Sequence, residues 1–456
     1  MNTLSRSELM WGLQCPLRLW KAKREPRMPH ALDPHSPAGQ IHVHARRMFP
    51  DGVRVPQALP WEEALRQSAQ AMTHARVVFR PAIEFEGLRI RPDLLLRTPK
   101  GGWRLGRVKA TTKLRPVHLQ ELAIEHFVMT QAGLAPVEVG VLCINRRYRA
   151  DKDEPLLRFV DRTEKVAQLA ATLPAELNPL RSIALEETPP NELPGRRCLW
   201  PRRCPYLREC QPEIPVALPT GDSPQARLFR RAKEHGRLCV LPGLLHKLEH
   251  DGPTSYLDFE AVAPAIPTLP GLKPFTTLPV QFSVHHKQPD GTLNSHAYLH
   301  RDSTDPRPPL AAALLEALQG DSPVYVWGDF EGKVIGKLGS ACPELEAPLS
   351  ALRKRIVDLQ TVVRAYAYHP AFGGSWSIKR VLPALVPGQD YGDLSVNDGA
   401  QAVLVWTHMQ HPDTDPDQAQ TLAEQLLAYC AMDTLALVHI REALLHRARL
   451  GAETWE

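Results

Sequence analysis

A proline-rich, irregular stretch, QPEIPVALPTGDSP, interrupts the sequence at residues 211–224. Proline fixes φ and lacks a backbone N–H, so closely spaced prolines end both helices and strands. The chain has 456 residues, roughly two to three times the usual size of a domain, so the residues on either side of the break can each bury a core. We therefore predict two domains, at residues 1–215 and 251–456, joined by a linker over residues 216–250.

Both halves of the chain mix strand-like and helix-like patterns. In the first half, strand character runs between Val77 and Val108, and a helical pattern over residues 118–134 is followed by another apolar strand. In the second half, strand-like segments at residues 254–262 and 278–287 are followed by helical segments, the last of which is long. We expect an α/β fold class, with a mixed sheet flanked by helices in the second domain.

The charge pattern suggests an anionic partner. The formal net charge is +5, and arginine-rich runs such as GRRCLWPRRC at residues 195–204 concentrate the positive charge. A merely solvated surface would explain these runs equally well. The chain does not start with a charged segment followed by an apolar one, and it contains no run of about eighteen apolar residues. We therefore expect a cytoplasmic protein with no membrane partner.

Cysteines mark a candidate metal cluster in the first half. The chain has eight cysteines, and their uneven spread argues against a disulfide framework. Five residues separate Cys198 from Cys204 and Cys204 from Cys210, and the prolines there favour a loop. These gaps are wider than those of zinc ribbons, whereas an iron–sulfur cluster accepts them and takes cysteine ligands. Cys15 is the candidate fourth ligand; zinc and four unrelated buried thiols are the alternatives.

Acidic residues recur in the patterned segments of the second half. Asp258 and Glu260 are two residues apart in the strand-like SYLDFEAV, so both side chains project from one face of a strand. Tyr429 and Asp433 are four residues apart in the last helical segment and share one of its faces. A single Asp-x-Glu pair is a weak signal, but both carboxylates of such a pair can bind one metal ion. The ordered set therefore predicts a divalent-metal site.

Several motifs of the first half resemble those of RecB-family nucleases that carry an iron–sulfur cluster. They are LQCPLRLWK around Cys15, then RPDLLLR, RVKATTK and the three later cysteines, in that order. The nucleases of CRISPR adaptation look similar. The resemblance implies a RecB-like, PD-(D/E)xK core of the restriction-endonuclease type. It also implies that a [4Fe-4S] cluster on Cys15, Cys198, Cys204 and Cys210 ties the two ends of this domain together.

The nuclease motif itself departs from the family pattern. RecB-type sites pair an Asp with a Glu-x-Lys on the next strand, but here Asp93 is followed by Arg107 and Lys109, with arginine at the glutamate position. A cation in place of a metal-binding carboxylate removes a ligand and repels the ion. The Gln-x-x-x-Tyr of the next helix is also replaced, by Glu125 and Met129. We expect a degenerate site in which Arg107 and Lys109 bind nucleic-acid phosphates.

The acidic set of the second half resembles the DnaQ-like exonucleases of the ribonuclease H fold, in the version whose last motif is Tyr-x-x-x-Asp. The resemblance implies that Asp258, Glu260 and Asp433 bind two divalent ions, Mg²⁺ or Mn²⁺. It also implies that Tyr429 orients the attacking water.

The second motif of that superfamily is an aspartate after a phenylalanine. Here Phe330 is followed by Glu331, so Glu331 is the expected acid and Asp329 the alternative. Taken together, the halves resemble a bacterial family, described as a domain of unknown function, that joins a RecB-like cysteine-cluster domain to a DnaQ-like exonuclease.

Four further residues are weaker candidates. Asp358 and Lys379 are candidates to support the acidic site, although a lone carboxylate after an apolar strand is often a helix cap. His42 and His44 offer nitrogen ligands to a metal, although isolated histidines are more often surface or core residues.

The resemblances imply a metal-dependent 3'–5' exonuclease that hydrolyses DNA, with single-stranded DNA favoured, and a first domain that grips the strand by its phosphates. Two alternatives stay open. One is a catalytically degenerate nucleic-acid-binding subunit of a larger defence or repair complex. The other is an exoribonuclease, because metal-binding acids do not discriminate a 2'-hydroxyl. A role in antiviral defence, CRISPR adaptation or repair, and any protein partner, rests on family likeness.

Overall fold

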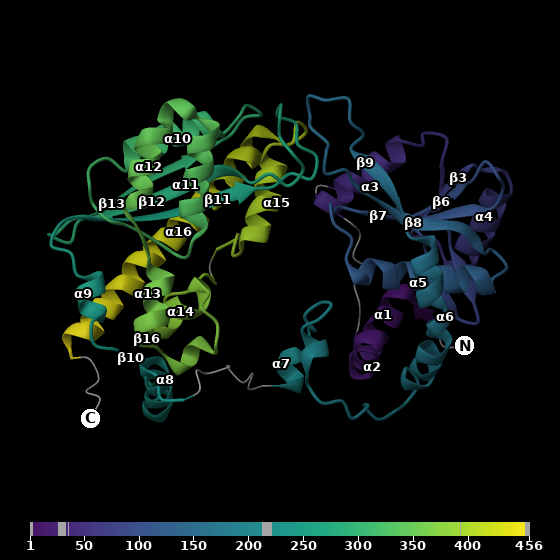
Figure 1. Cartoon of the computed structure of the whole chain (residues 1–456), viewed down its shortest axis with the longest axis horizontal. Coiled ribbons are helices and arrows are strands. Elements are labelled where there is room, and N and C mark those ends of the chain that lie inside the picture. Colours follow the sequence, from purple (N-terminus) through teal and green to yellow (C-terminus); the bar gives the residue numbers. More distant parts are fainter. Residues whose placement is uncertain (1–2, 26–32, 35, 212–220, 393, 452–456) are drawn as a thin grey trace. The chain divides into compact units, whose positions relative to one another are not determined.

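The computed structural model describes residues 3–25, 33–34, 36–211, 221–392 and 394–451 (Figure 1). The chain divides into two compact units. The first holds residues 1–213 together with 264–276, and the second holds residues 214–263 and 277–456. The predicted boundary after residue 215 lies outside the described residues. Both units combine helices with mixed sheets, which confirms the α/β class.

A six-stranded mixed sheet lies at the centre of the first unit. Two of its inner strands, β7 (Trp103–Lys109) and β8 (Pro136–Ile144), run parallel because the helix α5 (Pro116–Gln131) connects them. Most other neighbouring strands are antiparallel. In spatial order its strands are β2 (Val53–Arg54), β3 (Val77–Phe79), β6 (Leu94–Arg97), β7 (Trp103–Lys109), β8 (Pro136–Ile144) and β9 (Leu157–Asp161). A smaller sheet consists of β1 (Leu4–Ser5), β5 (Leu88–Ile90) and β4 (Ile83–Phe85).

Helices cover both faces of the six-stranded sheet. A capping box begins α1 (Arg6–Gln14), since Ser5 accepts from the Glu8 N–H and the Glu8 carboxylate accepts from the Ser5 N–H. The helix that begins there packs with α5 and α6 on one face, whereas α3 packs against β7 on the other. The helices are α1 (Arg6–Gln14), α2 (Pro16–Arg24), α3 (Pro37–Arg47), α4 (Trp61–His74), α5 (Pro116–Gln131), α6 (Thr163–Ile183), η1 (Arg196–Cys198) and α7 (Leu207–Cys210).

The second unit is built on a five-stranded mixed sheet. Its first three strands in spatial order are antiparallel neighbours, and the last two run parallel to β11. In that order the strands are β13 (Leu293–Leu299), β12 (Leu278–Lys287), β11 (Thr254–Val262), β14 (Val324–Val326) and β15 (Ile356–Asp358). The strands predicted at residues 254–262 and 278–287 are therefore confirmed.

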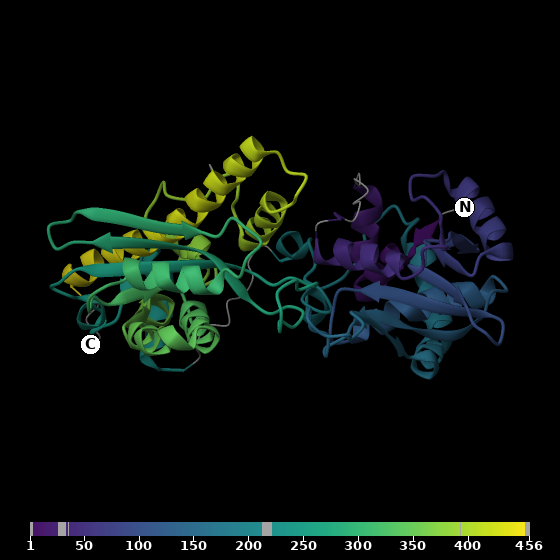
Figure 2. The same ribbon diagram turned by 90° about the horizontal axis from the view of Figure 1, so that it is seen from above.

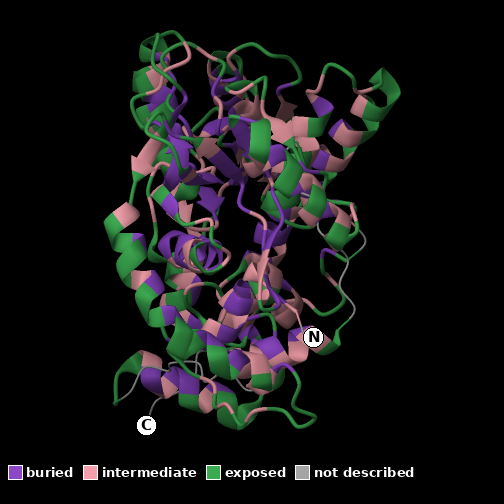
Figure 3. Ribbon diagram, turned by 90° about the vertical axis from the view of Figure 1, so that its right-hand side faces the viewer, coloured by how far each residue is buried: buried purple, intermediate pink, exposed green. Residues whose placement is uncertain are grey.

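Alternating side chains of β11 point into two different cores. Leu257 and Phe259 pack with one set of helices, the first group. Tyr256 packs with another set, the second group, on the opposite face of the sheet. Figure 2 shows α16, drawn in yellow, running along the sheet, and Figure 3 shows buried residues gathered where helices and strands meet. The first group is α10 (Arg307–Ala317), α11 (Phe330–Ala341) and α12 (Glu346–Lys354); the second is α13 (Leu359–Tyr366), α14 (Ile378–Leu385), α15 (Gly399–Met409) and α16 (Pro416–Arg449).

Much of the predicted linker over residues 216–250 belongs to the second unit, so that prediction is wrong. Its described part contains α8 (Pro224–His235), β10 (Cys239–Val240) and α9 (Leu244–Leu248). Phe229 of α8 stacks on Tyr368, with ring centroids 3.9 Å apart, and β10 pairs with β16 (Ala367–Tyr368). These contacts hold the segment against the core of the second unit. The local sequence of the segment does not predict this packing.

Between β11 and β12, residues 264–276 leave the second unit and pack on the first. Ala265 is fully buried in an apolar cluster of the first unit that includes Val108 and Ile144. The Gly271 N–H also donates to the Asp151 carboxylate at 2.8 Å. The strand that carries Asp258 and Glu260 therefore continues directly into a segment anchored in the first unit.

The C-terminal helix α16 is long and apolar enough to cross a membrane by length and composition alone. Its apolar residues instead pack in the second unit's core, where Leu426, Leu437 and Ile440 are almost fully buried. This is the packing of a core helix. Two short 3-10 turns complete the described elements, η2 (Pro343–Leu345) and η3 (Pro370–Phe372).

Candidate functional site

The acidic residues of β11 face helix α16. Asp258 and Glu260 alternate with Leu257 and Phe259, so the apolar pair fills one core while the acids point to the other face of the sheet. The strand register shifts just after Glu260, between Glu260 and Ala261. Period-two alternation thus places both carboxylates on the face that α16 covers.

Hydrogen bonds fix α16 on that face. The Gln281 side-chain amide donates to the Leu426 carbonyl at 2.8 Å. The Thr434 hydroxyl, next to Asp433, lies 2.9 Å from the Ser283 hydroxyl and 2.8 Å from Nδ1 of His285. These contacts between β12 and α16 set the position of the helix along the sheet and bring Asp433 over β11.

The three acids form a compact cluster. Ligand oxygens of Asp258, Glu260 and Asp433 all lie within 4.8 Å of one another. Burial, followed by the charge of Asp433, raises the pKa of Glu260 to about 8. Burial and the charges of Asp433 and Glu331 raise the pKa of Asp258 as well. Carboxylates that repel one another this strongly ionise readily when a divalent cation binds, so the cluster fits a metal ion.

Two tyrosines and a lysine surround the cluster. The Tyr391 hydroxyl donates to Asp433 Oδ1 at 2.6 Å, and this hydrogen bond opposes the rise that burial causes in the pKa of Asp433. Lys379 Nζ donates to the Tyr429 hydroxyl at 3.1 Å and lies 4.9 and 5.0 Å from the ring centroids of Tyr429 and Tyr391. No sequence pattern pointed to Tyr391, which lies in an irregular segment after α14.

Glu331 and Asp329 occupy different environments. Glu331, in the first turn of α11, is 3% exposed, and its Oε2 has no hydrogen-bond partner among the described residues. Burial, together with the charges of Asp358, Asp329 and Asp433, raises the pKa of Glu331 to about 8. Asp329 has a side chain that is 76% exposed and pairs with Lys333. Only Glu331 of the two has an orphaned buried oxygen of the kind that a metal ion would satisfy.

Asp358 acts as a helix cap. Its carboxylate accepts from the Thr361 N–H at 3.2 Å and from the Gly328 N–H at 2.9 Å. The bond from Thr361 caps the first turn of α13, which matches the helix-cap alternative for this residue.

Cys430 lies beside the cluster on α16. Its Sγ lies 3.5 Å from Asp258 Oδ2 and 3.7 Å from the Asp258 carbonyl oxygen. Burial and the charge of Asp258 raise the pKa of this thiol, so it stays protonated and can donate to the carboxylate. Its place between Tyr429 and Asp433 in the sequence carried no signal of this contact.

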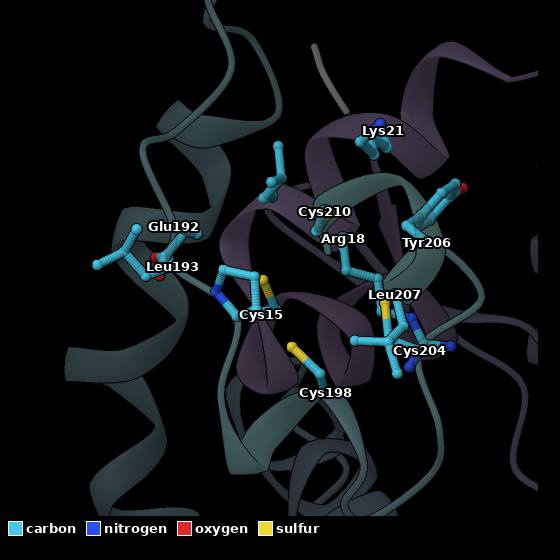
Figure 4. Close-up of a pocket in the computed structure, with 12 residues that line it drawn as sticks. Cys15, Arg18, Lys21, Glu192, Leu193, Cys198, Cys204, Tyr206, Leu207 and Cys210 are labelled. Carbon is cyan, nitrogen blue, oxygen red and sulfur yellow. The ribbon is translucent and has the colours of Figure 1, made fainter. Parts of the chain in front are cut away.

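The four predicted cluster cysteines line one pocket of the first unit (Figure 4). Cys15 lies between α1 and α2, and the other three lie on the loop that contains η1 and α7. The Gln14 side-chain amide holds this loop by donating to the carbonyls of Arg197 and Arg202, both at 2.6 Å. The topology therefore brings Cys15 to the three later cysteines across the length of the first unit.

The four thiols share one pocket and influence one another's ionisation. Burial raises the pKa of Cys204 and Cys210, and the neighbouring sulfurs raise it further. Thiols gathered in this way suit a metal centre with cysteine ligands, either one zinc ion or an iron–sulfur cluster.

The predicted degenerate site of the first unit is a buried ion-pair network. Arg107 is 5% exposed and lies 3.2 Å from Asp93, 3.1 Å from Glu125 and 3.7 Å from Glu121. Burial opposes ionisation of Asp93, but the nearby charges of Arg107, His42 and Arg80 together outweigh it and lower the pKa of that carboxyl below its usual range. Lys109 pairs with Glu121. Arg107 is thus occupied by carboxylates and not free for phosphate, which corrects the expected role of this residue.

Of the two predicted histidines, His42 lines a cavity of the first unit and His44 does not. Asp93 and Arg107 line the same cavity. Burial lowers the pKa of both, and nearby arginines lower it further.

A family model matches part of the second unit. Residues 255–377 match the model of a family described as a domain of unknown function, DUF2779. This range contains Asp258, Glu260 and Glu331 but ends before Tyr429 and Asp433. A comparison with curated proteins gives no match.

Proposed function

We propose that the second unit is a metal-dependent 3'–5' exonuclease that hydrolyses the phosphodiester bonds of DNA, preferentially single-stranded DNA. The observation that carries the proposal is the cluster of Asp258, Glu260 and Asp433, whose oxygens lie within 4.8 Å of one another. Glu331 supports it, because this buried glutamate has an oxygen without a hydrogen-bond partner in the described part of the chain. Three clustered acids with a buried fourth near them suit a pair of divalent ions.

The topology of the second unit supports a ribonuclease H-like fold. Its sheet has an antiparallel meander of three strands, followed by two strands parallel to the first of them. Helices cover both faces, and the acids come from the first strand and from the last helix. This is the order of elements that the resemblance to DnaQ-like exonucleases implies.

The chain's own residues have distinct tasks in such a reaction. Asp258, Glu260 and Asp433, with Glu331, would hold Mg²⁺ or Mn²⁺, which supplies charge stabilisation and an activated water. Tyr391 keeps Asp433 oriented through its hydrogen bond.

Lys379 and Tyr429 act on the water and the phosphate. Lys379 donates to the Tyr429 hydroxyl, which fixes the direction of that group's own proton. The Tyr429 hydroxyl also hydrogen-bonds the Asp433 carboxylate, so it lies beside the metal ligands, where it would orient the attacking water. The ammonium of Lys379 also offsets the negative charge that gathers at the cluster.

We further propose that Cys15, Cys198, Cys204 and Cys210 hold a [4Fe-4S] cluster that acts as a structural clasp. The fit rests on four thiols that line one pocket of the first unit. Such a cluster would cross-link the N-terminus of the first unit to its last loop. In this proposal the first unit, with a RecB-like core, binds the nucleic acid that the second unit degrades.

Degradation of end-labelled oligonucleotides tests the exonuclease. DNA and RNA strands labelled at either end are incubated with Mg²⁺ or Mn²⁺ and the native protein, Asp258→Ala, Lys109→Ala or Glu424→Ala. Glu424 is an exposed acid of the same helix as Asp433 and serves as a matched control. Stepwise shortening of DNA from the 3' end that only Asp258→Ala abolishes supports the proposal. Loss only in Lys109→Ala would place catalysis in the first unit, and no cleavage by any form would refute an exonuclease.

Metal analysis tests the cluster. Protein purified without oxygen should contain about four iron and four sulfide ions per chain. Cys198→Ala should lose iron and the thiolate-to-iron absorbance, whereas Cys143→Ala, which removes a buried thiol of β8, should keep both. Iron content that does not change in Cys198→Ala would refute this ligand set.

A further inference from the structure

The first unit contains a large cavity with a strongly basic lining. Its volume is about 1190 Å³, and its walls come from α3, β7 and the segments near them. Asp93 is the acid among the lining residues. The cations that line it are Arg46, Arg54, Arg80, Arg107, Lys109, Arg115 and Arg202.

The charged side chains at the floor of this cavity are paired with one another. Arg107 binds Asp93 and Glu125, and Arg80 lies 3.0 Å from Asp93 on the other side. The Arg107 guanidinium thus lies next to Asp93. A metal ion bound to Asp93 would need further carboxylates at that position. A divalent cation placed there would be repelled by both arginines. The floor therefore offers a fixed positive wall and no place for a catalytic ion.

The rim of the cavity, in contrast, carries arginines without counter-charges. Among the described residues, Arg46, Arg54, Arg115 and Arg202 form no ion pair with a carboxylate. Arg54, Arg115 and Arg202 are exposed, and Arg46 is half-buried. Burial and the nearby charge of Arg54 lower the pKa of Arg46, because like charges lie close together here. Uncompensated cations around a cavity favour an anion with several negative groups.

We infer that this cavity binds the phosphodiester backbone of a single nucleic-acid strand without a metal ion, through Arg46, Arg54, Arg115 and Arg202. The inference rests on the proposed function and deepens it, because it names the residues of the first unit that grip the substrate. The volume of the cavity exceeds the range of about 300–1,000 Å³ that is usual for small ligands. Cations on several segments of its wall match a row of phosphates better than one phosphate group.

Binding without turnover tests the inference. Fluorescence anisotropy measures the affinity of the full-length protein for a labelled single-stranded DNA in a metal chelator, which also prevents hydrolysis. The test variant is the double substitution Arg54→Gln and Arg115→Gln. The control is Arg66→Gln with Arg76→Gln, which removes the same charge from two exposed arginines of the first unit that lie outside the cavity lining.

The expected result is about tenfold weaker binding for the cavity variant and unchanged binding for the control. The slope of log K against log salt should also fall by roughly 1.4 in the cavity variant, since each lost phosphate contact removes about 0.7 for a single strand. Equal losses in both double variants would overturn the inference, because they would mean diffuse attraction. Binding that disappears in chelator would also overturn it, because the strand would then depend on a metal.

A competition experiment distinguishes two phosphate ligands, a nucleic-acid strand and a free nucleotide. A nucleoside triphosphate should compete poorly at the same phosphate concentration, whereas an unlabelled oligonucleotide should compete fully. Equal competition would show that the cavity is a nucleotide site and would refute strand binding. Failure of the proposed exonuclease is distinguishable, because it appears as absent 3' shortening in Mn²⁺ while binding in chelator persists.

Discussion

Raising the pH should strengthen metal binding at the acidic cluster. The pKa values of Glu260 and Glu331 are both raised to about 8, and burial is the largest cause in each case. At pH 6 to 7 both side chains are therefore mostly protonated, and a divalent ion must displace their protons before it can bind. Above pH 8 the protons have already left, so this cost disappears.

The magnitude follows from the two pKa values. Below pH 8, each carboxyl that must lose its proton should raise the apparent metal affinity by about tenfold per pH unit. If both Glu260 and Glu331 bind, the rise from pH 6 to pH 7 approaches a hundredfold, and it levels off above pH 8. Carboxyls with the ordinary pKa of about 4.5 would give almost no change over this range.

The metal-free protein should show the opposite trend in stability. An acid whose pKa is raised on folding stabilises the folded state below its unfolded pKa, and this stability is lost as the pH rises through the folded value. The free energy of unfolding should therefore fall between about pH 4.5 and pH 8, and Mn²⁺ should restore it.

Isothermal titration calorimetry with Mn²⁺ checks this prediction. Titrations between pH 6 and 9, in buffers with different ionisation enthalpies, give the affinity and the number of protons released. Glu260→Gln should lower the pH slope by about one, because one titrating group is gone, whereas Glu424→Gln should leave it unchanged. An affinity that does not vary between pH 6 and pH 8, or binding with no proton release, would refute the reasoning.

Three further predictions concern single residues. Arg107→Met should lower the free energy of unfolding by about 3–5 kcal/mol in urea denaturation, because it leaves buried carboxylates unpaired, and the loss should be smaller at pH 5, where they can take up protons. A loss no larger than that of the exposed Arg66→Met would contradict it. Tyr391→Phe removes the hydrogen bond to Asp433 and should weaken Mn²⁺ binding about 10- to 100-fold, with unchanged affinity as the contrary result. Glu331→Gln should abolish hydrolysis, whereas Asp329→Asn should change it less than about twofold; the reverse pattern would make Asp329 the metal ligand.

Local patterns predicted much of the second unit correctly. The strands at residues 254–262 and 278–287 were readable from their strand-like patterns. The alternation of side chains along the first of these strands indicated that the side chains of Asp258 and Glu260 lie on one face of the strand. These features depend on neighbours within a few positions, so the sequence displays them directly.

Other features depended on contacts between distant parts of the chain. The linker prediction failed because α8 packs on Tyr368, more than a hundred residues away, through apolar contacts that no local pattern signals. The expected phosphate role of Arg107 changed for a similar reason. Its carboxylate partners lie just before β6 and on α5, and only their packing brings them into contact.

The sequence by itself determined the strand that carries Asp258 and Glu260, the helix that carries Tyr429 and Asp433, and the cysteines that can serve as ligands. Strand and helix periods decide such matters, because they arise from backbone geometry within a few residues. The tertiary structure alone decided that Tyr391 donates to Asp433 and that Glu331 is buried where Asp329 is exposed. Those choices follow from how elements pack across the fold, since burial and charge are properties of the assembled surroundings and not of the local chain.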